Sequence, residues 1–287
     1  MPELPEVEMV RRQLADKIVG KTIADVEVLA DKAAGNDPQF AKELVGQKIT
    51  GLERKGKYLF FVLSGDDSFL VGHLRMTGRI IFVSADSEEE HGGGHALSKS
   101  VASQPHKHTR IIFTFKDGSH LYYNDMRKFG YLKRATAEDI NKQKEALGLE
   151  PLADSYTLES FSKILAGRRT SVKAALLKQS DIAGLGNIYV DEACWRAEVR
   201  PDRTAGEFSE VEVKALFEAT QSVLEDAIEH GGTTFRDYVD TGGKNGNFTD
   251  KLAVFGREGE ACPLCGETIK KSRVAGRGTH FCPQCQN

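Results

Sequence analysis

Four cysteines close to the end of this 287-residue chain constrain its fold more than any other feature. They form two pairs, Cys262 with Cys265 and Cys282 with Cys285, and sixteen residues separate the pairs. Two cysteines with two residues between them can present both thiolates to one tetrahedral ion. The quartet therefore predicts one structural Zn²⁺. The alternative is two disulfides, which a reducing intracellular compartment disfavours.

The segment between the cysteine pairs is long enough for a β-hairpin and is basic. After Glu267 it contains no acidic residue, and it carries Lys270, Lys271, Arg273 and Arg277. The whole chain has a net charge of −3, but residues 251–287 have six Lys or Arg against three Glu. Because the local field steers a polyanion, the hairpin is a candidate contact for a nucleic-acid duplex. A solvated basic turn is the alternative.

Composition places the chain among globular proteins, with 40% apolar and 28% charged residues and enough length for two ordinary domains. No apolar run approaches the roughly 20 residues of a membrane span. The first residues lack the basic start and apolar core of a signal peptide, so we expect a cytoplasmic protein without a targeting signal. Cys194 stands alone and is expected to be a small buried side chain.

The first half of the chain predicts one helix followed by an antiparallel sheet sandwich or barrel. Val7, Val10, Leu14 and Ile18 repeat at helical spacing within a helix over Glu3–Val19. Strands are predicted over residues 57–63, 69–76 and 79–83, and a hairpin joins 110–115 to 119–125 around Lys116-Asp117-Gly118. Residues 84–104, rich in Ser, Gly, His and acid, are interpreted as a mobile surface insertion.

The second half of the chain is predicted to be helical, which makes the fold class α+β. Helices are expected over residues 158–167 and 170–179, after a Gly-rich turn within 184–197, and over 209–232, the last with a capping box of Ser209 and Glu212. The Gly- and Asn-rich stretch 233–248 reads as a loop. We predict domain boundaries at 1–135, 136–250 and 251–287, the last being the zinc finger.

A glycine turn between two of these helices is a candidate phosphate site. Arg168, Arg169 and Lys173 precede Gly184-Leu185-Gly186, and Asn187 adds an amide donor at the start of the next helix. Backbone N–H groups at a helix N-terminus suit a phosphate. A plain turn is the alternative, but beside a basic zinc hairpin the pattern favours contact with a DNA backbone.

The first residues, MPELPEVEMV, have two possible uses. If Met1 is removed, Pro2 exposes a secondary amine, and α-amines titrate near about 7.7–8 in peptides. Such an amine can attack a sugar carbon and form an iminium, with Glu3 as a neighbouring acid or base and Glu6 one helical turn further on. The alternative is an ordinary helix start with proline and acidic residues.

Six motifs together resemble the bacterial formamidopyrimidine-DNA glycosylase family. In chain order they are MPELPEVE, KGKYLFF, HLRMTGR, NDMRKFG, GLGNIYVDEACW and the paired cysteines. The resemblance covers nearly the whole chain. It implies an N-terminal helix with a β-sandwich, a helix–two-turn–helix domain and a four-cysteine zinc-finger hairpin. The implied activity is a bifunctional DNA glycosylase and lyase in base-excision repair of oxidised purines, chiefly 8-oxoguanine and formamidopyrimidines.

The resemblance implies four catalytic residues. Pro2 matches the nucleophile that forms a Schiff base with C1′, and Glu3 matches the acid that assists ring opening or base loss. Lys57 matches the lysine assigned to protonation in β-elimination, and the alternative is that its charge holds a phosphate beside the lesion. Arg277 matches the position assigned as proton donor in δ-elimination, although a guanidinium with a pKa above about 12 is a poor acid and suits phosphate clamping better.

The resemblance also implies a set of DNA contacts. Met76, Arg127 and Phe129 match residues that fill the gap left by an extruded base. The alternative role is core packing for Met76 and Phe129, and a surface ion pair for Arg127. The matched DNA-contacting positions are His108, Arg127, Arg168 and Asn187. The loop 233–248 corresponds to the segment that covers the flipped base. The stretch 84–104 is longer than the family's usual connection and ends just before His108.

Two other functions remain open on these residues. One is the sister branch of the endonuclease VIII type, which removes oxidised pyrimidines. That branch typically begins with glycine where this chain has Leu4. The other is a protein that binds lesions without cutting, which has no need for Pro2 or Glu3. The expected partner is damaged double-stranded DNA, with no membrane, and the expected state is a nucleoid-associated monomer.

Overall fold

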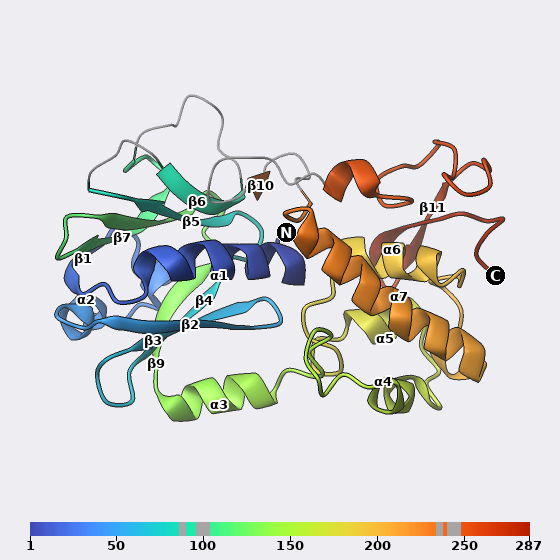
Figure 1. Cartoon of the computed structure of the whole chain (residues 1–287), viewed down its shortest axis with the longest axis horizontal. Helices are drawn as coiled ribbons and strands as arrows, with labels where there is room; N and C mark the ends of the chain where they lie inside the picture. The colour runs from blue at the N-terminus through green and yellow to red at the C-terminus, as the bar shows by residue number, and fades with distance from the viewer. Residues whose placement is uncertain (86–89, 96–103, 234–237, 240–247) are drawn as a thin grey trace. The chain divides into compact units, whose positions relative to one another are not determined.

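The computed structural model describes residues 1–85, 90–95, 104–233, 238–239 and 248–287 (Figure 1). These residues form two compact units, which are described separately. The first comprises Met1–Glu145 and His230–Thr249, and the second comprises Ala146–Glu229 and Asp250–Asn287. The first unit thus includes His230–Thr249, which follow the helical stretch in the chain.

The first unit contains one N-terminal helix and two antiparallel sheets. The helix is α1 (Leu4–Ile18). The six-stranded sheet has the order β1 (Ile23–Val28), β7 (Thr109–Phe115), β8 (His120–Asp125), β5 (Gly78–Val83), β6 (Glu90–His95) and β10 (Tyr238–Val239). The four-stranded sheet has the order β2 (Ile49–Lys55), β3 (Tyr58–Leu63), β4 (Phe69–His73) and β9 (Tyr131–Ala135). Short helices η1 (Asp31–Ala34), α2 (Phe40–Leu44) and α3 (Ala137–Glu145) complete it.

Both sheets and α1 share one hydrophobic core. The predicted apolar stripe of α1 lies in it, fully buried, together with side chains of both sheets. Strand β3 shows the two-residue period of a strand, because Leu59 and Phe61 face this core whereas Phe60 packs with Ile140 of α3 on the other side. The predicted helix and sandwich are confirmed. The stripe anchors α1 and thereby fixes the position of residues 2 and 3.

Of the local predictions for this unit, one is confirmed and two differ from the structure. The hairpin around Lys116-Asp117-Gly118 is confirmed as β7 and β8. The strand expected over 69–76 ends at His73, because a turn begins at Leu74 and its carbonyl accepts a hydrogen bond from the N–H of Gly78. The interpretation of 84–104 as a mobile insertion is wrong for residues 90–95, which form strand β6 between β5 and β10. Residues 86–89 and 96–103 lie outside the described residues.

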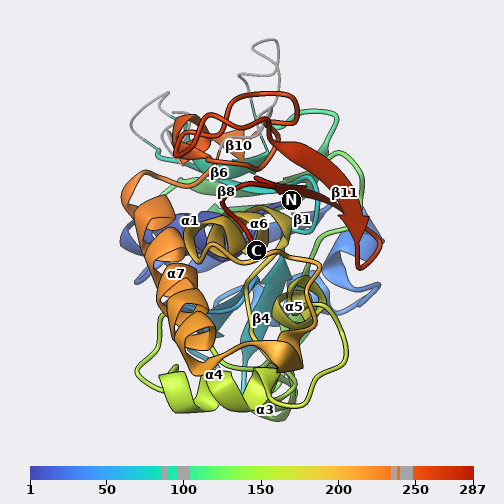
Figure 2. The ribbon, with the colours of Figure 1, turned by 90° about the vertical axis from the view of Figure 1, so that its right-hand side faces the viewer.

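The second unit is helical and ends in a hairpin. Its helices are α4 (Leu158–Leu165), α5 (Val172–Leu177), α6 (Asn187–Arg196), η3 (Ala205–Glu207) and α7 (Glu210–Glu229). The short helix η4 (Phe248–Lys251) spans the boundary of the units, and the hairpin consists of β11 (Lys270–Val274) and β12 (Arg277–Phe281). Helix α6 contacts α5, α7 and β12 (Figure 2). The four helices expected from the sequence are confirmed, and so is the capping box, in which the N–H of Ser209 donates to Glu212 at 2.8 Å.

The structure also bears on two further expectations, the burial of Cys194 and the absence of a membrane span. The Cys194 side chain is fully buried, and burial raises the pKa of its thiol. None of the helices in the described ranges combines the length and apolar character that a membrane span requires.

Candidate active site and nucleic-acid interface

The predicted reagent at the chain start is held in a defined place. Pro2 is buried and Glu3 is 3% exposed, whereas Met1 is exposed. Glu3 is the N-cap of α1, and its backbone N–H donates to a carboxylate oxygen of Glu6 at 2.8 Å. This reciprocal capping pattern and Pro5 in the first turn fix the helix start. The three predicted residues Pro2, Glu3 and Glu6 are therefore brought together.

Glu6 also holds a distant part of the chain. Its second carboxylate oxygen accepts hydrogen bonds from the N–H of Thr233 at 2.9 Å and from the Thr233 hydroxyl at 3.0 Å. The carbonyl of Gly232 accepts a bond from the N–H of Phe248 at 3.3 Å, so both ends of the predicted lesion-covering loop are anchored near Glu6. Residues 234–237 and 240–247 of that loop lie outside the described residues.

Lys57 lies in the turn between β2 and β3 and is 7% exposed. Arg54 supports this turn, since its guanidinium donates to the carbonyl of Gly56 at 3.0 Å and to Glu8 of α1 at 2.8 Å. Arg11 and Arg12 also bind Glu8. Burial tends to raise the pKa of Glu8, but the bonds from Arg11, Arg54 and Arg12 outweigh it and lower that pKa to about 2. A buried ion pair thus joins the helix that carries Pro2 to the turn that carries Lys57.

His73 belongs to the same region and was not singled out from the sequence. Its ring packs edge-on against Tyr58, the residue after Lys57, with 4.6 Å between ring centroids. Burial, followed by the charges of Arg75 and Lys57, lowers the pKa of His73 to about 3, so the ring is neutral at physiological pH. Its Nδ1 accepts the N–H of Arg75 at 2.9 Å. The HLRM motif alone gave no signal that this histidine is close to Lys57.

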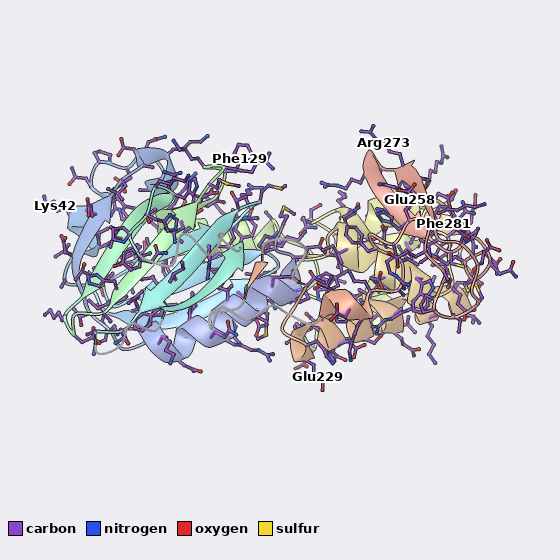
Figure 3. All side chains as sticks on the ribbon, turned by 90° about the horizontal axis from the view of Figure 1, so that it is seen from above. Lys42, Phe129, Glu229, Glu258, Arg273 and Phe281 are labelled. Carbon is purple, nitrogen blue, oxygen red and sulfur yellow. The ribbon has the colours of Figure 1, made fainter. Side chains whose placement is uncertain are left out.

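The predicted gap-filling side chains are exposed rather than packed in the core. Met76 is 39% exposed and Phe129 is 51% exposed, and Phe129 lies at the periphery of its unit (Figure 3). The guanidinium carbon of Arg127 lies 4.9 Å from the centre of the Phe129 ring. The alternative of core packing therefore fails for Met76 and Phe129. His108 is half-buried, and burial, followed by the charges of Lys107 and Arg110, lowers the pKa of its ring.

In the second unit, the hairpin between the cysteine pairs is tied to α5 and α6. Lys173 and Asp191 are completely buried and form an ion pair at 2.6 Å. Asp191 also accepts the backbone N–H of His280 at 2.9 Å, and the side-chain amide of Asn187 donates to the carbonyl of Gly278 at 2.9 Å. Asn187 is therefore brought beside Arg277, whose side chain is exposed at the start of β12. Arg168 instead pairs with Asp181.

Helix α6 organises a further segment through Glu192, which the sequence did not reveal. The buried Glu192 carboxylate accepts three backbone hydrogen bonds at 2.8–2.9 Å, from Ala253, Val254 and Phe255. Burial is the largest influence on Glu192 and raises its pKa. Adjacent acidic residues on one helix thus bind the hairpin and the segment that leads into it.

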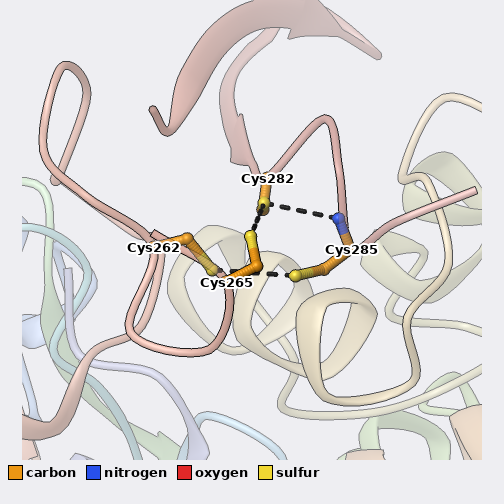
Figure 4. A group of neighbouring side chains, drawn as sticks. All are labelled: Cys262, Cys265, Cys282 and Cys285. Carbon is orange, nitrogen blue, oxygen red and sulfur yellow. Dashed lines mark hydrogen bonds between the residues drawn. The ribbon is translucent and has the colours of Figure 1, made fainter. Parts of the chain in front are cut away.

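The four predicted metal ligands converge (Figure 4). The sulfur atoms of Cys262, Cys265, Cys282 and Cys285 all lie within 4.8 Å of one another. Sulfur separations are 3.8 Å for Cys262 with Cys285 and 3.5 Å for Cys265 with Cys282. A tetrahedral Zn²⁺ with bonds of about 2.3 Å requires sulfurs about 3.8 Å apart, so this donor set fits zinc. Four protein thiolates close the coordination shell, which makes the site structural.

Comparison with known proteins agrees with this arrangement. Residues 1–132 match the model of the formamidopyrimidine-DNA glycosylase N-terminal domain, residues 147–239 match its H2TH domain, and residues 259–287 match a zinc finger found in FPG and IleRS. The formamidopyrimidine-DNA glycosylase of Heliobacterium modesticaldum is 44% identical over 290 residues, covering 100% of both chains. The chain belongs to the formamidopyrimidine-DNA glycosylase family.

Solved structures resemble the chain over its full length. A Lactococcus lactis Fpg in complex with DNA containing an abasic site has a TM-score of 0.87 and 36% identity, and 99% of each chain is covered. A MutM in complex with DNA containing carbocyclic 8-oxo-G has a TM-score of 0.86 and 36% identity, and 100% of each chain is covered.

Proposed function

We propose that this protein removes oxidised purines, namely 8-oxoguanine and formamidopyrimidines, from DNA and then nicks the strand. It is a bifunctional DNA glycosylase and lyase of base-excision repair. The single observation that carries the assignment is the chain start, where buried Pro2 and Glu3 are fixed by Glu6 at the N-terminus of α1. Removal of Met1 would expose the secondary amine of Pro2 at this fixed position, directly beside Glu3.

The proposed first step uses Pro2 after Met1 has been removed. Its secondary amine attacks C1′ of the damaged nucleoside, and the C1′–N bond to the base breaks as the new C–N bond forms. Glu3 supplies a proton that assists opening of the sugar ring or departure of the base. The amine then loses its proton, and the C1′–O4′ bond breaks as the C=N bond forms, which leaves O4′ as a hydroxyl. The product is an iminium between Pro2 and the open sugar, which is the Schiff base that commits the strand to cleavage.

The proposed second step is strand cleavage by β,δ-elimination from that iminium. Lys57, in the turn held by Arg54 and Glu8, acts in the β-elimination that releases the 3′ phosphate. Arg277, exposed at the start of β12, binds phosphate with its two-pronged guanidinium and in this way assists the δ-elimination. Hydrolysis of the remaining iminium returns the free amine.

We further propose that the exposed side chains act on the duplex. Met76, Arg127 and Phe129 occupy the gap left by the extruded base, and His108, Arg168 and Asn187 contact the DNA backbone. The stretch 233–248 covers the extruded base. Bound Zn²⁺ supplies a rigid cross-link that holds the hairpin, and the protein's own residues do the chemistry. We also propose that the protein has the three predicted domains, acts as a monomer and works at the nucleoid in the cytoplasm.

Borohydride trapping tests the nucleophile. We expect wild-type protein to form a covalent adduct with duplex DNA that contains 8-oxoguanine opposite cytosine, and we expect none with Pro2→Gly or with Met1 retained. Pro5→Gly is the matched control, because it removes a proline from the same helix turn without changing the amine, and it should still trap. Abundant adduct with Pro2→Gly would place the nucleophile elsewhere.

A second assay tests the class of lesion. Turnover of 8-oxoguanine and of thymine glycol is compared under single-turnover conditions in otherwise identical duplexes. We expect the oxidised purine to be removed much faster. Faster removal of thymine glycol would assign the protein to enzymes for oxidised pyrimidines, and binding without any cutting would indicate a lesion-binding protein.

A further inference from the structure

A single buried carboxylate, that of Asp125, lies between the two loops that carry the exposed gap-filling side chains. Asp125 is the last residue of β8 and is 1% exposed. One loop, residues 74–77, follows β4 and carries Met76. The other, residues 126–130, follows β8 and carries Arg127 and Phe129. All of these residues belong to the first unit.

Asp125 accepts hydrogen bonds from both loops. Its Oδ1 accepts from the hydroxyl of Thr77, the neighbour of Met76, and from the backbone N–H of Arg127 at 3.1 Å. Its Oδ2 accepts from the N–H of Gly130, the neighbour of Phe129, at 2.8 Å. The Thr77 hydroxyl also accepts from the N–H of Arg127 at 3.0 Å. One side chain therefore sets the positions of Met76, Arg127 and Phe129 relative to one another.

The backbone of Asp125 extends the arrangement to His108. Its N–H donates to the carbonyl of His108 at 2.9 Å, and its carbonyl accepts from the guanidinium of Arg110 at 2.8 Å. The gap-filling side chains and His108 are thus each linked to Asp125, either directly or through a neighbouring residue. None of the proposed chemical steps uses it.

Both loops have backbone conformations that need such support. Arg75 and Lys128 have φ values of +51° and +57°, which non-glycine residues rarely adopt and which cost on the order of 1 kcal/mol each. Gly130 is confined, since an added Cβ would lie 2.2 Å from the Tyr123 hydroxyl and 2.7 Å from the carbonyl of His73. Strained, closely packed loops keep one shape only when the surrounding contacts determine it.

We propose that Asp125 is a positioning residue for base extrusion: with Thr77 it holds the two loops in the spacing that lets Met76, Arg127 and Phe129 enter the duplex together. The inference rests on the proposed function and adds a residue that touches neither the base nor the sugar. Preorganised loops spare the enzyme the entropy of ordering them on DNA. Asp125 should therefore matter for extruding a base, and matter little once no base has to be extruded.

The test compares two duplexes with the full-length, zinc-loaded protein. One contains 8-oxoguanine opposite cytosine, and the other contains an abasic site at the same position, from which nothing remains to be extruded. Single-turnover cleavage rates are measured on both. Misplacement of a group by about 1 Å can cost about a hundredfold in rate. Asp125→Asn should therefore lower the ratio of the rate on 8-oxoguanine to the rate on the abasic site by about tenfold or more. Thr77→Val, which has the same shape without the hydroxyl, should lower it in the same direction.

The control is Asp117→Asn, at the other end of the β7–β8 hairpin, where the carboxylate accepts the N–H of Ser119 at 3.1 Å. It removes the same charge and also a loop hydrogen bond, and it should leave the ratio unchanged. Folding is checked by thermal unfolding. An unchanged ratio in both Asp125→Asn and Thr77→Val, or an equal loss on both duplexes, would overturn the proposal. Failure of the wild type to cut either duplex would instead overturn the proposed function.

Discussion

Glu6 and Thr233 are 227 positions apart in the chain, yet one carboxylate oxygen of Glu6 accepts both the N–H and the hydroxyl of Thr233. The other oxygen accepts the N–H of Glu3. One buried side chain therefore connects the proposed reagent with the start of the stretch proposed to cover the extruded base. A change in either partner should affect the other, because both are bound by the same carboxylate.

Glu6→Gln should weaken both connections. In the wild type, each of these donors faces a carboxylate oxygen of Glu6. In the variant, the side-chain NH₂ group replaces one of the oxygens, and an unsatisfied buried donor costs about 1–3 kcal/mol. We expect a loss of unfolding free energy of that size, measured with urea, together with slower excision of 8-oxoguanine. Thr233→Ser keeps the hydroxyl and should behave like the wild type. Wild-type excision by Glu6→Gln would show that the connection does not serve the reaction.

The ion cluster around Glu8 predicts a specific dependence of stability on pH. The pKa of Glu8 is lowered to about 2, so its contribution to stability is complete above the unfolded value near 4.5 and is lost as the pH falls towards 2. At pH 7, Glu8→Gln should cost about 3–5 kcal/mol, because it breaks a buried pair. Below pH 4.5 the difference between variant and wild type should narrow by about 1.4 kcal/mol for each pH unit.

Urea unfolding of both proteins at pH 7, 4.5 and 3.5 measures this difference directly. Glu138→Gln is the control, since Glu138 forms an exposed pair with Lys142 on α3 that is worth little. A constant difference between Glu8→Gln and wild type across these pH values would contradict the shifted pKa.

The buried pair of Lys173 and Asp191 should be needed for the position of the hairpin. Lys173→Met leaves Asp191 charged and buried, which costs about 3–5 kcal/mol. The double variant Lys173→Met, Asp191→Asn removes both charges and should recover much of that stability, but not DNA affinity, because the bond from Lys173 to the carbonyl of Gly278 is still missing. Unfolding and DNA binding are measured in parallel, with the exposed Lys163→Met as control. Full affinity in the double variant would exclude this role.

Removal of the metal should act on binding before it acts on chemistry. Metal analysis is expected to give about one zinc per chain, as four thiolates form one closed site. Cys262→Ser should lower zinc content and DNA affinity together, while Cys194→Ser, which lies outside the quartet, should change neither. Normal DNA affinity in metal-free Cys262→Ser protein would contradict a role of the finger in binding.

The sequence was most informative where one local pattern determines one structure. The stripe of α1, the β7–β8 hairpin and the cysteine quartet are of this kind, and all three are confirmed. It was least informative where position depends on partners far along the chain. Strand β6 exists because β5 and β10 supply its hydrogen bonds, and the stretch 84–104 has no strand pattern of its own.

The same distinction applies to the candidate site. Residues such as Pro2 and Arg277 stand out by chemical type or by their place in a motif. Glu8, Asp125 and Glu192 are ordinary acidic residues in the sequence, and only the fold shows that each accepts several hydrogen bonds from distant segments. Their importance arises from burial, which a single sequence does not record.

Because the hairpin is attached to α6, the zinc finger is not an independent module that could be moved to another protein unchanged. Residues 259–287 match a separate domain model, yet their hairpin is bound by Asn187 and Asp191, and Glu192 binds the segment before it. A graft of these residues onto another scaffold would keep its metal but lose the orientation of Arg277. Evolution of this finger is therefore tied to evolution of a helix 63 to 91 positions earlier, and the two are expected to change together.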